Sequence, residues 1–220
     1  MIRLLSPLNL ALVAATVLAA IAGFVLVPAG VELPVHWNVH GEADWFLPRE
    51  LALILPLGLQ LATVVLFALA LRFAPSAKSG IAESGSAIVG AAITTLLLIG
   101  LVVEVVTVLI GTGVPVSMVQ AIVGVLAVML LVVGNALPKS QPNSVAGVRI
   151  HSTLADAGNW QATHRLTGAL AMISGLALLI AALLLPPGVT LFASAIAAVL
   201  LPVIVGVVYS LSRARRAKRS

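Results

Sequence analysis

Residues 87–110 read AIVGAAITTLLLIGLVVEVVTVLI, and this stretch decides the fold class of the chain. About 20 apolar residues are needed for a helix to cross the hydrocarbon core of a bilayer, and this stretch exceeds that length. Its only ionisable residue is Glu104. Lipid offers no hydrogen-bond partner to the backbone, so such a segment satisfies its own N–H and C=O groups as a helix. We therefore predict a membrane-spanning helix here.

Five further stretches are similarly apolar, in a chain of 220 residues that is 61% hydrophobic and only 9% charged. This composition lies far from that of a soluble globular domain. The sequence predicts an all-α, polytopic integral membrane protein with six transmembrane helices. There is no cysteine, which excludes a disulfide framework, a thiol nucleophile and cysteine-ligated zinc. The predicted spans are Leu8–Val27, Leu51–Leu71, Ala87–Ile110, Val116–Val133, Leu166–Leu185 and Val189–Leu211.

The positive charges predict the orientation, because cytoplasmic loops are enriched in Lys and Arg. With six spans, both termini and the loops after the second and fourth spans share one side. Of the 12 Lys and Arg residues, only Arg49 falls on the other side. We therefore expect the N- and C-termini to be cytoplasmic. The basic tail at 212–220 then lies beside anionic lipid headgroups as a topology anchor, and no direct contact with nucleic acid is expected.

Two long loops suggest two halves. Residues 1–110 form an N-terminal three-helix half with an outer loop at 28–50. Residues 111–220 form a second three-helix half with a cytoplasmic loop at 134–165. Each long loop follows the first span of its half, and the halves begin on opposite sides of the membrane. This is the outline of a 3+3 inverted repeat, although the similarity between the loops is short enough to arise by chance.

The outer loop gathers polar residues in the segment HWNVHGEAD at 36–44. Glu104 lies seven residues before Gly111, or roughly 10 Å below the outer end of its predicted helix. A carboxylate at that depth is costly in lipid, so it should face the protein interior or a wet cavity. We predict an outward pocket with Glu104 at its floor. The pocket residues are His36, Asn38, His40, Glu42, Asp44 and Glu104.

The imidazoles and carboxylates of this set also suit a metal ion. His36, His40, Glu42, Asp44 and Glu104 are candidate ligands for zinc or another divalent ion, although their spacing matches no helical zinc motif. The alternative is that no cofactor is needed. In that case Glu104 is protonated and bonded to Thr107 or Gln120, with the histidines solvated above it.

The cytoplasmic loop at 134–165 reads GNALPKSQPNSVAGVRIHSTLADAGNWQATHR. The segment TLAD at 153–156 predicts a capping box that starts a new helix. Asp156, Trp160 and His164 would then share one face of that helix. Two interpretations stay open. Either the polar groups satisfy one another, or Arg149, His164 and Arg165 converge on an anion or an acidic partner.

Two segments resemble known families. GNALPKSQPNSVAGVR followed by NWQATHRLTG closely resembles the signature of the SdpI-like family of bacterial immunity membrane proteins. LPVHWNVHGEADW at 33–45 resembles the P-x-H-W/F-N-x-x-G-x-x-D block of a small domain of unknown function often found before it. The family usually reads G-I-R-x-P-W-T where this chain has GVRIHST, so His151 and Ser152 replace Pro-Trp. The matching positions of the first signature are Gly134, Asn135, Leu137, Pro138, Lys139, Pro142, Asn143, Gly147, Arg149, Trp160, Thr163, His164, Arg165 and Gly168.

The resemblance implies a protein of the bacterial plasma membrane that protects its cell against a secreted peptide toxin. It also implies recruitment of a transcriptional repressor on the cytoplasmic side. The missing Pro-Trp pair argues against this recruitment, because a contact made by that tryptophan is lost. Two other hypotheses follow from the residues. One is a metal-dependent membrane hydrolase acting at the outer surface, and the other is a small transporter suggested by the inverted halves and the deep acid.

Overall fold

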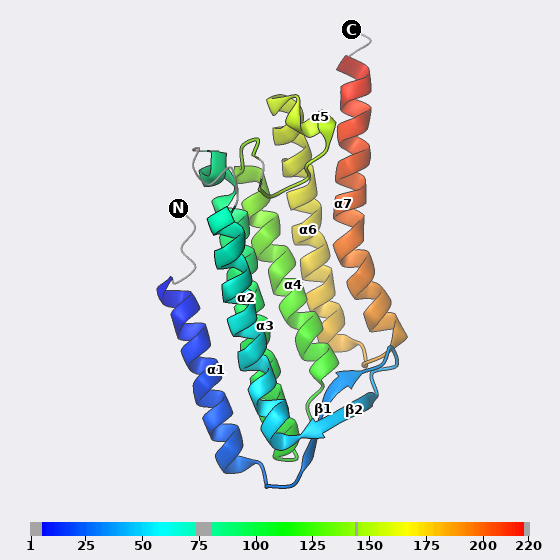
Figure 1. Ribbon diagram of the computed structural model, residues 1–220. Helices are drawn as coiled ribbons and strands as arrows, with labels where there is room; N and C mark the ends of the chain where they lie inside the picture. The colour runs from blue at the N-terminus through cyan, green and yellow to red at the C-terminus, as the bar shows by residue number, and fades with distance from the viewer. Residues whose placement is uncertain (1–5, 74–80, 144, 218–220) are drawn as a thin grey trace.

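The computed structural model describes residues 6–73, 81–143 and 145–217, and shows a bundle of long helices with a hairpin across one end (Figure 1). In this part of the chain six helices are long and apolar enough to cross a membrane, and each contains most of one predicted span. The predicted all-α membrane fold is confirmed. The elements are α1 (Pro7–Leu26), β1 (Glu32–Trp37), β2 (Ala43–Pro48), α2 (Arg49–Phe73), α3 (Ile81–Gly111), α4 (Met118–Ala136), η2 (Leu137–Lys139), α5 (His151–Leu154), α6 (Ala157–Leu184) and α7 (Val189–Ala217).

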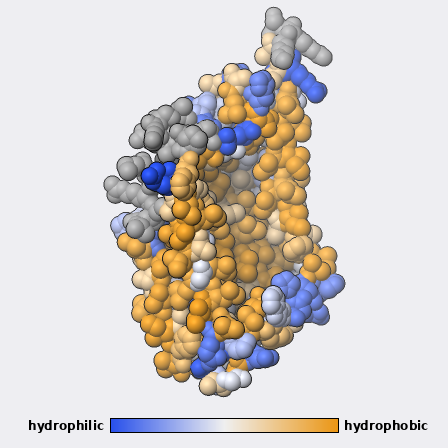
Figure 2. Space-filling model, viewed as in Figure 1, coloured by the Kyte–Doolittle hydropathy of each residue, from blue (hydrophilic) through white to orange (hydrophobic). Residues whose placement is uncertain are grey.

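The helices form two groups of three, joined through α3 and α4, rather than a closed ring. α1 and α2 pack against α3, α3 against α4, α4 against α6, and α6 against α7. The seam between the predicted halves is therefore the contact of α3 with α4. α1 begins and α7 ends at the same end of the bundle, here called the terminal end, and the β-hairpin marks the opposite, hairpin end (Figure 1). An apolar band lies between more hydrophilic ends (Figure 2).

The cytoplasmic orientation of the termini and the internal duplication both stay predictions. Four of the charges that predict the orientation, Arg3, Lys78, Lys218 and Arg219, lie outside the described residues. The two long loops have different structures, since one is a β-hairpin and the other contains a 3₁₀ turn and the short helix α5.

Buried polar side chains tie the three N-terminal helices together. Gln60 on α2 donates through Nε2 to Oγ1 of Thr16 on α1 at 2.8 Å and to the carbonyl of Leu97 on α3 at 2.7 Å. Nearer the terminal end, Thr94 on α3 donates to Oδ1 of Asn9 on α1 at 2.8 Å. Apolar burial gives helices little reason to associate within lipid, so such interhelical hydrogen bonds help to hold them.

The C-terminal helices instead approach through small residues. A Cβ added at Gly168 on α6 would lie 2.5 Å from the carbonyl oxygen of Gly134 on α4, and one at Gly134 would lie 2.8 Å from the carbonyl oxygen of Gly168. Further along the same contact, a Cβ at Gly175 would lie 2.9 Å from the carbonyl oxygen of Ala127. Only glycine permits this backbone approach, which brings the two helices into van der Waals contact along their length.

The outer loop is more regular than the sequence analysis predicted. Its strands β1 and β2 pair antiparallel, with Leu33 opposite Leu47 and His36 opposite Trp45. Leu33 is buried in an apolar cluster with Val27, Leu53 and Val108. The alternation of apolar and polar residues in ELPVHW was too short, and too interrupted by Pro34, to predict a strand from the sequence.

The start of α6 differs from the predicted capping box. Asp156 is the N-cap residue itself, and its carboxylate accepts from the backbone N–H of Gly158 at 2.7 Å and of Asn159 at 3.2 Å. Thr153 belongs to α5, where its Oγ1 accepts from the N–H of Ile150 and donates to the carbonyl of Val148. The predicted box was wrong because it placed Thr153 and Asp156 in the same helix start, whereas they serve two successive ones.

Gly168→Ala should destabilise the protein, because the added Cβ is 2.5 Å from the Gly134 carbonyl and forces α4 and α6 apart. We expect a loss of ~1–3 kcal/mol in free energy of unfolding. Thermal unfolding in detergent measures it. Gly124→Ala is the matched control, because nothing lies within 4 Å of a Cβ at that position on α4. Equal stability of the two variants would contradict the close-contact explanation.

Candidate functional site

The tip of the β-hairpin is built by Asn38. Its Oδ1 accepts from the backbone N–H of His40 at 2.9 Å and of Glu42 at 3.1 Å, while its Nδ2 donates to the Glu42 carboxylate at 3.1 Å. Gly41 follows with φ +83°, a left-handed conformation that suits glycine. Asn38 and Gly41 are therefore required by the turn, and this explains two letters of the block at 33–45.

His36 and Asp44 form the polar pair of the hairpin. His36 Nδ1 lies 2.5 Å from Asp44 Oδ1, across the two strands, and both side chains are partly exposed. His40 is exposed at the tip. The structure thus brings His36 to Asp44 and Asn38 to Glu42, and leaves His40 facing solvent.

The hairpin tip also contacts the C-terminal half. A Cβ added at Gly41 would lie 2.6 Å from Pro187 Cβ, and one at Gly188 would lie 3.6 Å from the His40 carbonyl oxygen. Both proline and glycine belong to the short connection between α6 and α7. The hairpin therefore spans from α1 and α2 to the α6–α7 connection, across the seam between the halves (Figure 1). Trp45 and Phe46, on β2, remain 61% and 45% exposed.

Glu104 is fully buried on α3, with an exposed fraction of 0%. Neither carboxylate oxygen has a hydrogen-bond partner among the described residues. Val108, one turn nearer the hairpin, belongs to the apolar cluster with Leu33 and Leu53, so apolar side chains cover this turn of α3 on the hairpin side. Gln120, one of the two expected partners, instead donates to the Leu185 carbonyl at 2.8 Å.

The five candidate metal ligands are not gathered in this conformation. Within residues 6–73, 81–143 and 145–217, no three His, Asp or Glu side chains form a group that could hold a metal ion. The pocket above Glu104 and its metal stay predictions. Joining Glu104 to the hairpin pair would require the intervening apolar cluster to open.

The segment at 140–150, between η2 and α5, is here called the terminal-end loop. It is held in place by Trp160 and His164, both buried on α6. The two rings stack with centroids 4.0 Å apart. Trp160 Nε1 donates to the Ser140 carbonyl at 3.1 Å. His164 Nε2 accepts from the Val148 N–H at 3.0 Å, so its proton lies on Nδ1, which donates to the Trp160 carbonyl at 2.8 Å. These contacts hold the loop against α6.

Several other family positions have equally local roles. A Cβ at Gly147, whose φ is +117°, would lie against His164 Nε2, so the imidazole needs glycine beneath it. Asn143 Oδ1 accepts from the N–H groups of Val145 and Ala146, both at 2.8 Å. Lys139 donates to Asn135 Oδ1 at 3.2 Å, and the Pro138 carbonyl accepts from Gln161. Pro142 follows Gln141 in the same turn.

Arg149 and Arg165 do not join His164. Both are exposed, whereas His164 is fully buried with both ring nitrogens bonded. The interpretation that the polar groups of this loop satisfy one another therefore describes His164 and Trp160, and the two arginines form a separate exposed surface. Their charges remain available to a soluble partner.

Sequence reasoning missed residues that connect distant elements. Asn159 donates to the carbonyls of Ser152 at 3.0 Å and Ser210 at 3.1 Å, and the Ser152 and Ser210 hydroxyls lie 2.8 Å apart. This links α5, α6 and α7. Arg49 donates to the Val27 carbonyl at 2.8 Å and lies over the Phe24 ring. The one available signal was that Arg49 is the sole positive charge on its predicted side.

The fold and these sites define a polytopic α-helical membrane protein. Residues 139–210 match the family model described as the SdpI/YfhL protein family, which spans the terminal-end loop, α6 and most of α7. The predicted resemblance to the SdpI family is confirmed over this segment, and the six long apolar helices confirm a multi-pass membrane protein. The match does not reach the N-terminal block at 33–45. No curated protein and no solved structure matches the chain.

Trp160→Phe should loosen the terminal-end loop, because it keeps the ring but leaves the buried Ser140 carbonyl without its donor. The cost is ~1–3 kcal/mol. We expect faster tryptic cleavage after Arg149 in purified protein. Trp45→Phe is the control, since the indole N–H of Trp45 makes no hydrogen bond to a described residue. Identical cleavage of both variants would contradict the role assigned to the indole N–H.

Glu104→Met should stabilise the protein, because it replaces a buried carboxyl group without a partner by an apolar group of similar size. We expect ~1–3 kcal/mol more free energy of unfolding. Gln60→Met provides the opposite control, since it removes two buried hydrogen bonds and should destabilise. If both variants lose stability to the same extent, Glu104 has a bonding partner within the folded protein.

Proposed function

We propose that this protein is an immunity protein that protects a bacterial cell against a membrane-active peptide toxin arriving from the hairpin side. The observation that carries the proposal is the match of residues 139–210 to the SdpI/YfhL family, supported by the resemblance of the same segment to immunity proteins. The physical question is how such a bundle could intercept an amphipathic peptide.

The arrangement of the helices offers a surface within the membrane. The two groups of helices meet through α3 and α4, and α1 and α2 are not among the helices that pack against α6 and α7. Figure 2 shows a hollow in the apolar band, in the region where Figure 1 places α4 and α6, with polar residues of the hairpin region at its lower end. An amphipathic helix could lay its apolar face there, as helices do in apolar grooves.

The hairpin suits the polar face of the same peptide. It is held at one end by the apolar cluster around Leu33 and at the other by the contact of Gly41 with Pro187. Its acids, Glu42 and Asp44, would attract a cationic peptide, and its exposed Trp45 and Phe46 lie where aromatic side chains anchor at headgroup depth. In this proposal, the hairpin surface captures the peptide.

In this proposal, the terminal-end loop is the surface that a cytoplasmic partner recognises. It is pinned to α6 by Trp160 and His164, and it presents Arg149 and Arg165 to solvent. A cytoplasmic partner such as a repressor would dock on these charges. Ser152 replaces the tryptophan usual in the family and bonds to Ser210 on α7, so contact with such a partner would depend on the arginines.

A survival assay tests the proposal. Sensitive bacteria that express the protein should grow at a concentration of a cationic amphipathic peptide that kills cells carrying the empty vector. Asp44→Asn should reduce this protection, because it removes a surface charge and weakens the contact with His36 Nδ1. Glu32→Gln is the matched control, since Glu32 lies on the same hairpin and its carboxylate makes no hydrogen bond or ion pair with a described residue.

Immunoblots of the membrane fraction confirm equal amounts of each variant. Killing that is unchanged across a panel of peptides, with the wild-type protein present in the membrane, would overturn the immunity role. Protection that Asp44→Asn and Glu32→Gln retain equally would keep immunity but remove the hairpin from it.

A further inference from the structure

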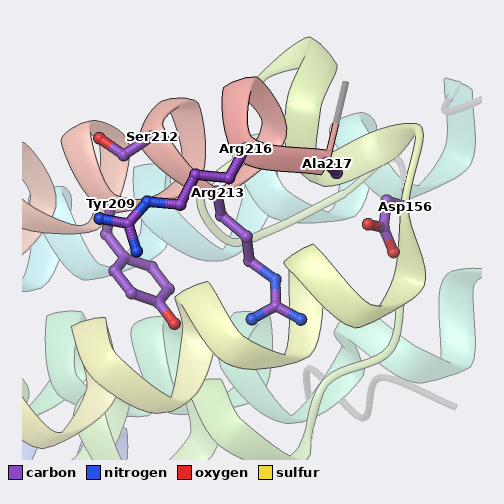
Figure 3. Close-up of a pocket in the computed structure, with 6 residues that line it drawn as sticks. All are labelled: Asp156, Tyr209, Ser212, Arg213, Arg216 and Ala217. Atoms are coloured by element: carbon purple, nitrogen blue, oxygen red, sulfur yellow. The ribbon is translucent and has the colours of Figure 1, made fainter. Parts of the chain in front are cut away.

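A second site lies at the terminal end, away from the hairpin and outside the family motif positions. A cavity of about 470 Å³ opens beside the last turns of α7, and it is lined by Asp156, Tyr209, Ser212, Arg213, Arg216 and Ala217. In Figure 3 the Arg213 side chain points from α7 toward the start of α6, whereas the Arg216 side chain runs back along α7 toward Tyr209. The site combines two cations with hydroxyl donors.

The charges of this cavity are unbalanced. Neither Arg213 nor Arg216 forms an ion pair with a described residue. The single acid, Asp156, is already engaged by the N–H groups of Gly158 and Asn159 at the start of α6. Arg213 Nη2 would lie 3.9 Å from a Cβ at Gly158, which places a guanidinium beside the positive end of a helix dipole. A cavity lined by two arginines and by the start of a helix, with no ion pair to a described residue, favours an anion.

The depth of the cavity identifies the kind of anion. The hydrocarbon core is about 30 Å thick, or about 20 residues of helix at 1.5 Å per residue. Counted from Val189, where α7 begins, this length ends near Tyr209. Tyr209 therefore lies at the boundary between acyl chains and headgroups, and Arg213 and Arg216 lie one and two turns beyond it. This is the level of the lipid phosphates.

We propose that this cavity binds a phosphate group, held by Arg213 and Arg216 with Tyr209 and Ser212 donating hydroxyl hydrogen bonds. The shared chemistry fits the headgroup of an anionic phospholipid or a soluble phosphate ester, and the depth favours the lipid. A planar guanidinium contacts two phosphate oxygens at once, which distinguishes a bound headgroup from diffuse attraction to a basic tail. The inference is independent of the immunity proposal.

The chain offers an internal control for diffuse attraction. Arg215 has the same charge and lies on the same turn of α7, but it lines a neighbouring cavity with His151 and Asn159, which shares only Asp156 and Ala217 with the first. Diffuse attraction depends on the number of charges alone, so removing any one of the three arginines would weaken lipid binding equally. A built site depends on which face of α7 carries the charge.

The test is a titration of purified protein in neutral detergent with fluorescent phosphatidylglycerol, phosphatidylcholine and inorganic phosphate. Phosphatidylglycerol should bind the wild-type protein, and phosphatidylcholine should bind at least tenfold more weakly. Arg213→Gln and Arg216→Gln should each weaken phosphatidylglycerol binding by about fivefold or more, and Arg215→Gln by less than twofold. Tyr209→Phe, which removes only a hydroxyl group, should weaken it by a smaller factor.

Each other outcome has a definite meaning. Inorganic phosphate that binds with the same dependence on Arg213 and Arg216, while phosphatidylglycerol does not, assigns the site to a soluble phosphate. Equal losses for all three arginine variants would overturn the proposal, as would equal binding of the two lipids. Unfolding temperatures measured without lipid verify that the variants fold, and Tyr209→Phe supplies the same test if an arginine variant does not.

Discussion

The backbone contact between α4 and α6 at Gly134 and Gly168 is the constraint on which the C-terminal half depends. Within lipid, apolar side chains gain little by meeting one another, so close approach of the backbones must supply the attraction. The approach at these two glycines leaves no room for a Cβ on either helix. It sets where Pro138 and the following loop leave the bundle, and a Cβ at Gly168 would also meet the Pro138 ring at 2.9 Å.

The same contact determines what the terminal-end loop can do. Once α4 and α6 are fixed, the chain from Ser140 to Ile150 must cross the end of α6, and Trp160 and His164 receive it with one hydrogen bond each to its backbone. An imidazole whose two nitrogens are both bonded has neither nitrogen free to bind an anion. Binding of an anion or a partner at this end would therefore depend on arginines. These are Arg149 and Arg165 near the loop, and Arg213 and Arg216 at the end of α7.

At the hairpin end, a different constraint connects the halves. Helices in an open arrangement expose more surface than a closed bundle, and the first and last of them are not among the pairs that pack together in the described residues. The hairpin crosses that gap, from the cluster around Leu33 to the connection at Pro187. Residues of the block at 33–45 serve this crossing: Asn38 and Gly41 form the turn, and His36 with Asp44 joins the strands.

The sequence by itself determined the fold class and the spans, because bilayer thickness and the absence of backbone partners in lipid leave apolar stretches such as 87–110 no other structure. It also pointed to the segments that carry function, since the polar loops stand out in so apolar a chain. Only the tertiary structure decided which side chains meet. Whether Glu104 faces Thr107, Gln120, the hairpin or no partner depends on how α3 is rotated against its neighbours. That rotation follows from packing rather than from hydrophobicity: Gly100 leaves room for the Gln60 side chain, and Val108 joins the apolar cluster around Leu33. The cavity at Arg213 and Arg216 arises in the same way, because α6 and α7 must be placed before their ends can enclose a space.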